Sequence, residues 1–248
     1  MAFFFIGHRG TRKVFDENTI KSFDIAIKSG ADYIEFDVRR TKDNQFIIFH
    51  DPSLDRTTNG SGTVDTFTYN ELSKFRTKKN NQKILLINEI LDRYRDKTKF
   101  MIELKEEGIQ DDILDLIKKK DLINKCIISG RNIYDLLSIK NKNPECLVCY
   151  NITKGKDLTL KSFLENEEFN KLEFPIDMLS LRSNQITKKF INICHMNNIL
   201  AFSWDFMEYE NSLEKIKNLI KMGIDGLLFD DFKNISHIKS WKYNLDYN

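Results

Sequence analysis

The stretch from residue 3 to residue 38 reads FFFIGHRGTRKVFDENTIKSFDIAIKSGADYIEFDV. It begins and ends with short hydrophobic runs, Phe3–Gly7 and Tyr33–Val38. Runs of this length and continuity are typical of parallel strands that are covered on both faces. Between them, Thr19–Lys28 has apolar residues at helical spacing, and Gly30 follows as a helix stop. The stretch therefore predicts a strand–helix–strand unit.

The same alternation continues along the rest of the chain. It predicts further strands at Phe46–Phe49, Phe100–Leu104, Cys126–Ser129, Leu147–Asn151, Met178–Leu181, Ala201–Trp204 and Gly226–Phe229. It predicts further helices at Asp112–Lys120, Ile133–Lys140, Thr187–Asn197 and Ser212–Met222. Roughly eight such repeats indicate right-handed βαβ units in a closed parallel sheet. A doubly wound open sheet would give the same periodicity.

Residues 51–83 interrupt this rhythm. The segment is polar and rich in turn-forming residues, including Asn59-Gly60-Ser61-Gly62. Helix and strand signals resume directly after it, so we predict an insertion and not a linker between domains. The chain has 248 residues, and α/β barrels of about 250 residues fold as one domain. We therefore expect a single domain, 1–248, with an insertion at about 51–83.

Bulk composition argues against several classes of function. A formal net charge of +2 gives no electrostatic case for binding nucleic acid or an anionic membrane surface. No stretch approaches the roughly 18 to 20 apolar residues of a membrane span, so we expect no stable membrane insertion. The N-terminal run Met1–Ile6 is too short for the core of a signal peptide. A cytoplasmic location is the resulting expectation, and the oligomeric state stays open.

Some reactive side chains are better explained as structural. Cys146 and Cys149 form a C-x-x-C string, but residues three apart on a strand point to opposite faces, and no second ligand pair completes a zinc set. His195 and His237 do not follow strands, so we expect scaffold roles for both. The pair Asp230-Asp231 is predicted to lie at the rim or at a helix start.

Ionisable residues mark the ends of the early strands. The first strand ends in His8-Arg9, the second carries Glu35 and Asp37, and the next ends in His50. Strand Phe100–Leu104 carries Glu103 and is followed by Lys105. Alternation places Glu35 with Asp37, and Glu103 with Lys105, on one face of their strands. Because catalytic groups of barrels gather at the C-terminal strand ends, we expect all of these side chains to converge.

This set of residue types indicates phosphoryl chemistry. Three crowded carboxylates repel one another unless a cation neutralises them, and oxygen ligands suit Mg²⁺ or Ca²⁺ better than zinc. Arg9 and Lys105 leave room for an anion beside the metal, and arginine binds phosphate in a bidentate manner. Two histidines from different strands offer an acid and a base on opposite sides of a scissile bond.

The same residues resemble a known family. The motifs are His8-Arg9-Gly10, Glu17-Asn18-Thr19, Glu35-x-Asp37, His50-Asp51, Leu54-Asp55-Arg56-Thr57-Thr58-Asn59-Gly60-x-Gly62 and Ile102-Glu103-Leu104-Lys105. In order and spacing they are similar to the glycerophosphodiester phosphodiesterase family. The resemblance implies an α/β fold, a TIM-like (β/α)8 barrel with a small insertion after the second βα unit. It also implies hydrolysis of glycerophosphodiesters to glycerol 3-phosphate and an alcohol.

The resemblance assigns a role to each motif residue. The implied metal ligands for Mg²⁺ or Ca²⁺ are Glu35, Asp37 and Glu103. The implied general acid/base pair is His8 and His50. The implied contacts to phosphate and substrate are Arg9, Lys105 and Trp204.

The chain also departs from the family pattern. Trp204-Asp205-Phe206-Met207 stands where the family usually has W-T-V-N, and Phe229 replaces a threonine before the last aspartate. We expect these changes to lie where the alcohol half of the substrate sits. Two alternatives stay open: a lysophospholipase-D-like hydrolysis of lysophospholipids, or a non-catalytic barrel that binds a phosphate ligand.

Overall fold

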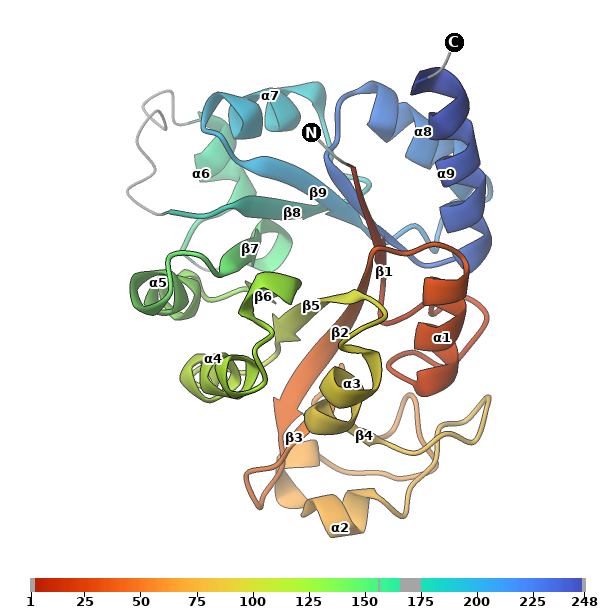
Figure 1. Ribbon diagram of the computed structural model, residues 1–248, viewed down its shortest axis with the longest axis vertical. Coiled ribbons are helices and arrows are strands. Elements are labelled where there is room, and N and C mark those ends of the chain that lie inside the picture. The colour runs from red at the N-terminus through yellow and green to blue at the C-terminus, as the bar shows by residue number, and fades with distance from the viewer. Residues whose placement is uncertain (1–2, 156, 166–174, 247–248) are drawn as a thin grey trace.

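A computed structural model describes residues 3–155, 157–165 and 175–246 of the chain. Within these residues, eight parallel strands form a closed barrel (Figure 1). They are β1 (Phe4–Gly7), β2 (Tyr33–Arg40), β5 (Lys99–Leu104), β6 (Cys126–Gly130), β7 (Leu147–Asn151), β8 (Met178–Arg182), β9 (Leu200–Trp204) and β10 (Gly226–Phe229). Because β1 pairs in parallel with both β2 and β10, the sheet is closed. The predicted barrel is confirmed, and the open sheet is excluded.

Helices surround the barrel on the outside (Figure 1). In chain order they are α1 (Ile20–Lys28), α3 (Ile87–Tyr94), α4 (Gln110–Lys119), α5 (Ile133–Lys142), α6 (Leu160–Glu165), α7 (Lys188–Met196), α8 (Ser212–Lys221) and α9 (Phe232–Asp246). Polar side chains begin several of them: Thr19 accepts a hydrogen bond from Ser22 N, and Thr187 accepts one from Phe190 N. Such caps satisfy backbone donors that lack a partner inside the helix.

Two apolar layers follow from the alternation of side chains along each strand. Residues that point outward pack against the helices and form the larger cluster, which includes Ile34, Phe36 and Ile102. Residues that point inward fill the barrel, among them Ile6, Met101 and Phe202. The barrel interior is therefore a packed core and not a channel. Polar inward-facing residues can only lie above this core, at the strand ends.

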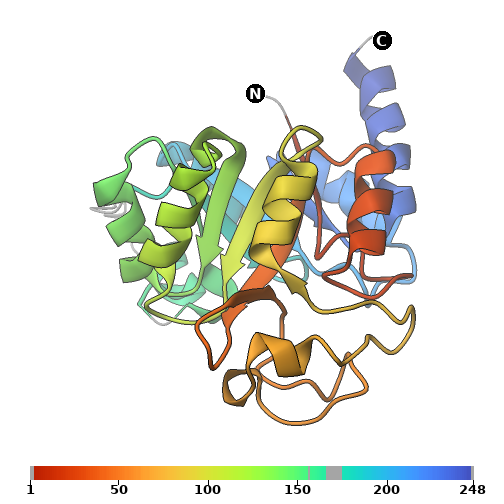
Figure 2. The same cartoon turned by 60° about the horizontal axis from the view of Figure 1, so that its bottom comes forward.

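The insertion leaves the barrel after β2. Strand β3 (Phe46–Ile48) pairs antiparallel with β2, and β4 (Leu85–Leu86) pairs antiparallel with β3. Between them lie a 3-10 turn, Val64–Thr66, and the short helix α2 (Tyr69–Leu72). Figure 2 shows this segment on the side toward which the strand arrows point. Since α3 follows the segment, it lies inside the second βα unit, whereas the sequence had placed it after that unit.

The insertion has a small core of its own and is attached to the loop after β1. Its core contains Ile47, Phe49, Leu54, Val64, Leu72 and Ile84. Asp16, from the loop after β1, accepts hydrogen bonds from Thr77 Oγ1 at 2.7 Å and from Asn80 N at 2.5 Å. A charged bridge joins the same parts, because Arg56 Nη2 lies 2.7 Å from Glu17 Oε1.

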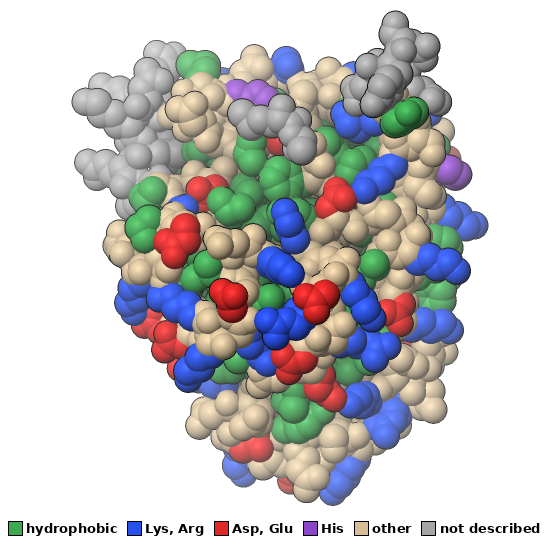
Figure 3. Space-filling model, viewed as in Figure 1, with side chains coloured by type: hydrophobic (Ala, Val, Ile, Leu, Met, Phe, Trp, Pro, Cys, Tyr) green, Lys and Arg blue, Asp and Glu red, His purple; other side chains and the backbone are tan. Residues whose placement is uncertain are grey.

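The surface carries no feature that changes these conclusions. On the face drawn in Figure 3, basic and acidic side chains are intermixed around a group of hydrophobic ones. No helix in the described part of the chain combines the length and the apolar character needed to cross a bilayer.

Candidate active site

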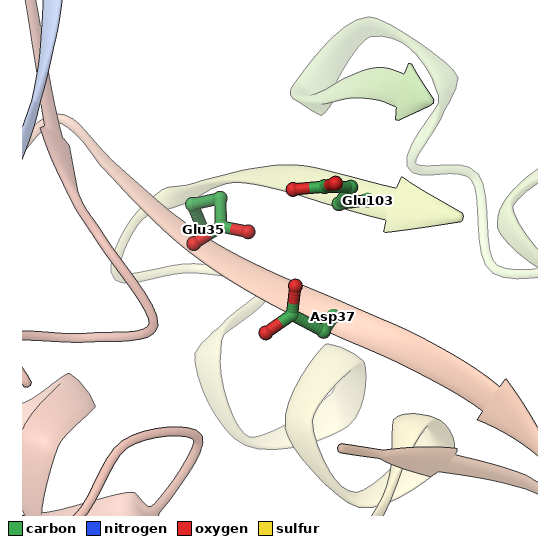
Figure 4. Close-up of side chains that lie close together, drawn as sticks. All are labelled: Glu35, Asp37 and Glu103. Carbon is green, nitrogen blue, oxygen red and sulfur yellow. The ribbon is translucent and has the colours of Figure 1, made fainter. Parts of the chain in front are cut away.

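Three carboxylates meet at the C-terminal end of the barrel. Glu35 and Asp37 lie on β2 and Glu103 on β5, and Asp37 is the register partner of Glu103. One oxygen from each lies within 4.8 Å of the others. Figure 4 shows the three side chains grouped above the two strands. All three are buried, and Glu35 and Asp37 are 0% exposed.

Three cations lie against these carboxylates: Lys105, Arg9 and, at 3.7 Å from Glu103 Oε1, Arg131 Nε. Lys105 Nζ is 2.7 Å from Glu103 Oε1 and 3.0 Å from Asp37 Oδ1. Arg9 Nε is 3.3 Å from Asp37 Oδ2, and Arg9 Nη1 is 2.9 Å from Glu17 Oε1. The side chains of Arg9 and Lys105 are buried with their partners. The structure therefore brings together all five residues that the sequence analysis assigned to metal and phosphate.

The surroundings shift the pKa values of two of these carboxylates in opposite directions. Burial, followed by the charges of Asp37 and Glu103, raises the pKa of Glu35 well above its ordinary value. Burial would also raise the pKa of Asp37, but Lys105 and Arg9 hold that pKa well below its usual range. Glu35 Oε1 is buried without a hydrogen-bond partner in the described part of the chain. Three buried carboxylates with an unpaired oxygen form a donor set that suits a hard divalent cation.

The loop after β1 has an unusual backbone that aims Arg9 at the cluster. Arg9 has φ +51° and Gly10 has φ +80°, in the left-handed region. In this conformation Arg9 N donates a 2.7 Å hydrogen bond to Glu35 Oε2. A Cβ on Gly10 would lie 2.6 Å from Ser22 Cβ, so only glycine fits there. Asn18, with φ +59°, donates a hydrogen bond from Nδ2 to Asp37 Oδ2 at 2.8 Å.

His8 is held by an aspartate from the opposite end of the sequence. His8 Nδ1 lies 2.8 Å from Asp230 Oδ1, and Asp230 is only 2% exposed. Asp230 also accepts hydrogen bonds from Arg12 Nε and from Phe206 N. The prediction that Asp230-Asp231 lie at the rim or at a helix start holds for Asp231, which accepts a hydrogen bond from Lys233 N at the start of α9. It missed the burial of Asp230 against His8, which arises because closure of the barrel places β10 beside β1. Neither spacing nor composition could reveal this contact across 222 positions.

His50 has a similar arrangement on the insertion. It follows β3, and its Nδ1 lies 2.6 Å from Asp51 Oδ1. Arg56 Nε in turn lies 2.5 Å from Asp51 Oδ2. Burial is the main cause that lowers the pKa of His50, to about 4. Burial and then Arg12 lower the pKa of His8, although Asp230 opposes the shift.

The mouth of the barrel is a narrow pocket beside the carboxylate cluster and His8, and His50 lines the neighbouring cleft. The mouth pocket is lined by His8, Arg9, Met101, Glu103, Lys105, Ser129, Arg131, Asn151, Ser180, Trp204 and Leu228. Trp204 stands edge-on to His8, with ring centroids 6.2 Å apart. The sequence analysis missed Arg131 and Asn151. Both lie at strand ends, β6 and β7, which is the signal that could have pointed to them.

The departures from the family pattern lie in the scaffold. Phe229 is fully buried and stacks on Phe5, with ring centroids 5.7 Å apart. Phe206 is 3% exposed and belongs to the outer core. Asp205 forms ion pairs with Arg12 and Arg182. Phe206 and Phe229 belong to the outer apolar layer and do not line the mouth pocket, whereas Met207 is exposed. That the changes lie beside the alcohol half stays a prediction.

The side chains expected to be structural lie outside the site. Cys149 belongs to the barrel interior and Cys146 to the outer layer, as alternation predicts, and both are free thiols. His195 is exposed on α7 and lies 2.8 Å from Asp225 Oδ2. His237 is exposed on α9. None of the four lines the mouth pocket.

Comparisons with known proteins agree with this geometry. The model of the glycerophosphoryl diester phosphodiesterase family matches residues 8–234. A glycerophosphodiester phosphodiesterase from Caldanaerobacter subterraneus subsp. tengcongensis is 30% identical over 238 residues, which cover 91% of this chain and 93% of that relative. An enzyme of the same name from Bacillus altitudinis is 28% identical over 241 residues, 91% of this chain and 93% of that protein.

Solved structures show the same fold. A glycerophosphoryl diester phosphodiesterase from Parabacteroides distasonis superposes with a TM-score of 0.80 at 23% identity, covering 97% of this chain and 87% of that one. A phosphodiesterase from Oleispira antarctica, in complex with the product sn-glycerol-3-phosphate, gives a TM-score of 0.77 at 21% identity and covers 94% of each chain. By the family match and the sequence relatives, the chain belongs to the glycerophosphoryl diester phosphodiesterase family.

Proposed function

We propose that this protein hydrolyses glycerophosphodiesters to glycerol 3-phosphate and an alcohol, with a divalent cation and a pair of histidines. The observation that carries the proposal is the buried cluster of Glu35, Asp37 and Glu103 with Arg9 and Lys105 against it. The three carboxylates would hold Mg²⁺ or Ca²⁺. When bound, the ion would neutralise charge on the phosphate oxygens.

The chain's own residues supply the remaining chemistry. Arg9 and Lys105 attract the phosphate and hold it at the mouth. With Nδ1 of each ring bonded to an aspartate, Nε2 is the nitrogen available to hold or move a proton. His8 comes from the barrel and His50 from the insertion, so the two rings approach the site from different segments. One accepts a proton from the attacking group while the other donates to the leaving alcohol.

A cleft beside His50 supports small, polar alcohols as leaving groups. Its volume is about 430 Å³, and it adjoins the mouth at Lys105 and Arg131. Most of its lining is ionisable or polar: Arg39, His50, Lys105, Glu106, Glu107, Arg131, Asn132 and Asp135. An acyl chain would lie against these charged side chains, and burying a charged group without a partner is costly. This favours deacylated diesters over lysophospholipids.

The test is a substrate and metal series. Hydrolysis of glycerophosphocholine and glycerophosphoethanolamine would be measured with Mg²⁺, with Ca²⁺ and after treatment with EDTA. We expect activity that EDTA abolishes and that either or both ions restore. Full activity after chelation would remove the metal from the proposal. Faster release of choline from lysophosphatidylcholine would instead favour the acylated substrate. Tight binding of glycerophosphocholine without turnover would identify a non-catalytic binder.

A further inference from the structure

The mouth pocket is lined by charged and by uncharged side chains. Arg9, Glu103 and Lys105 line it from the loop after β1 and from the end of β5, where the proposed phosphate site is. Asn151 and Trp204 line the same pocket from β7 and β9. Arg131 lines it after β6 and Arg182 lies over the Trp204 ring, but Asn151 and Trp204 are themselves uncharged and suit a neutral polar group of a substrate.

Both of these side chains have a buried polar atom without a partner. Asn151 is the last residue of β7 and is 4% exposed. Its Oδ1, an acceptor, has no hydrogen-bond partner among the described residues. Trp204 Nε1, a donor, is also buried, and no acceptor for it lies in the described parts of the chain.

Unpaired buried groups of this kind point to a ligand that pairs with them. Leaving a buried donor or acceptor unsatisfied costs stability, and most buried polar groups in proteins are bonded. A hydroxyl can satisfy both groups, because it donates to an amide oxygen and accepts from an indole N–H. The glycerol half of a glycerophosphodiester has two hydroxyls. One adjoins the carbon that bears the phosphate ester, and the other is at the far end.

We infer that Asn151, together with Trp204, binds the terminal hydroxyl of the glycerol half and so makes this protein select glycerol diesters. The inference rests on the proposed function. Strand β7 is separated from β5 by β6, so the hydroxyl most distant from phosphorus is the one that reaches Asn151. The alcohol half then lies toward His50 and its cleft, which adjoins the mouth at Lys105 and Arg131.

The experiment compares two substrates that differ in this one hydroxyl. The first is glycerophosphoethanolamine. The second has propane-1,2-diol in place of glycerol and keeps the hydroxyl next to the ester. For the wild-type protein we expect kcat/KM to be about 3- to 10-fold higher for the glycerol diester, the effect of one neutral hydrogen bond. In Asn151→Leu the ratio should fall to about 1, with Asn151→Ala as a second variant.

Asn143→Leu is the matched control. Asn143 is also buried, at 8% exposure, and its Oδ1 also lacks a partner in the described segments, but it caps the C-terminal end of α5 away from the mouth. It should keep the wild-type ratio. An unchanged ratio in both Asn151 variants would overturn the inference, as would an equal loss of the ratio in Asn143→Leu.

A binding measurement tests this inference independently of the proposed hydrolytic function. Calorimetry with glycerol 3-phosphate and with propane-1,2-diol 1-phosphate measures the same preference without turnover. If the wild-type protein hydrolyses neither diester, the proposed function fails. A preference for glycerol 3-phosphate that Asn151→Leu removes would still support the binding role. Equal affinity of the wild-type protein for both phosphates would refute it.

Discussion

Each histidine of the site is paired with an aspartate, and each aspartate is paired with an arginine. Asp230 binds His8 and Arg12, and Asp51 binds His50 and Arg56. A carboxylate on Nδ1 fixes the orientation and the tautomer of an imidazole. The two pairs therefore prepare both rings in the same way, although they come from unrelated segments of the chain.

Removal of either ring should abolish most of the activity. We expect His8→Ala and His50→Ala each to lower kcat by about 10²- to 10⁴-fold, the usual value of an acid/base group. His195→Ala is the control, because His195 lies on α7 and pairs with Asp225. Steady-state kinetics on glycerophosphoethanolamine would measure this, with circular dichroism to check folding. Wild-type kcat in either of the first two variants would contradict the acid/base roles.

The buried Asp230 should make stability depend on pH. Burial would raise the pKa of this carboxyl, but His8 and Arg12 hold it well below the ordinary value. Its ion pairs therefore stabilise the fold above about pH 4, and this contribution is lost as the pH falls further toward the folded-state pKa. Urea unfolding of the wild-type protein and of Asp230→Asn should show a larger difference at about pH 7 than at about pH 3.5. A difference independent of pH would contradict this.

At the level of residues, the sequence predicted those groups that follow strands and belong to motifs. Glu35, Asp37 and Glu103 come together because alternation and strand register are local rules. Asp230 and Asn151 could not be assigned in this way. The contact of Asp230 with His8 depends on barrel closure, and the significance of Asn151 depends on an unpaired oxygen that only coordinates show.

At the level of elements, the loop between β1 and α1 depends on one glycine. Gly10 and Gly108 both have positive φ, +80° and +77°. A Cβ on Gly10 would overlap Ser22, whereas a Cβ on Gly108 would meet nothing within 4 Å. Gly108→Ala should cost about 1–2 kcal/mol of unfolding free energy from the backbone alone. Gly10→Ala should cost about 1–3 kcal/mol more, from the overlap.

Denaturant unfolding of the two variants would measure the difference, and equal costs would show that the contact with Ser22 is unimportant. Gly10→Ala should also weaken phosphate binding, because the same turn holds Arg9 N against Glu35. Gly108 has no such contact with the carboxylate cluster, which makes it a suitable control for both measurements.

The elements themselves were largely predictable. All eight barrel strands were predicted. A parallel strand that is buried on both faces is a short, nearly continuous apolar run, and this pattern can be recognised from the local sequence alone. Helices α2, α3, α6 and α9 were not predicted. Helix α2 lies inside the turn-rich insertion, α3 follows it directly, and α6 is a short helix, Leu160–Glu165, so none of these three stood out in the alternation. The place of the insertion inside the second βα unit depended on recognising α3.

At the level of the whole molecule, the reactivity of the four cysteines measures whether the two apolar layers are packed, because the cysteines are buried in these layers. All are buried free thiols, and burial raises the pKa of Cys146 to about 11 and that of Cys149 to about 12. Thiolates are the reactive form. A thiol reagent at about pH 8 should therefore modify none of them in the folded protein and all four after unfolding. Rapid modification of a folded sample would contradict the packing described above.

His50 and Asp51 follow the antiparallel strand β3, on a segment that is not one of the eight barrel strands. One of the two histidines proposed to handle protons is thus encoded in a piece of chain that recombination could exchange as a unit between related enzymes. Such an exchange would leave the carboxylates and Arg9 in place. The incoming segment would need to bring equivalents of Arg56 and Thr77, because these tie it to Glu17 and Asp16. The insertion with His50 and the barrel with the carboxylates and Arg9 could then have separate evolutionary origins within one protein.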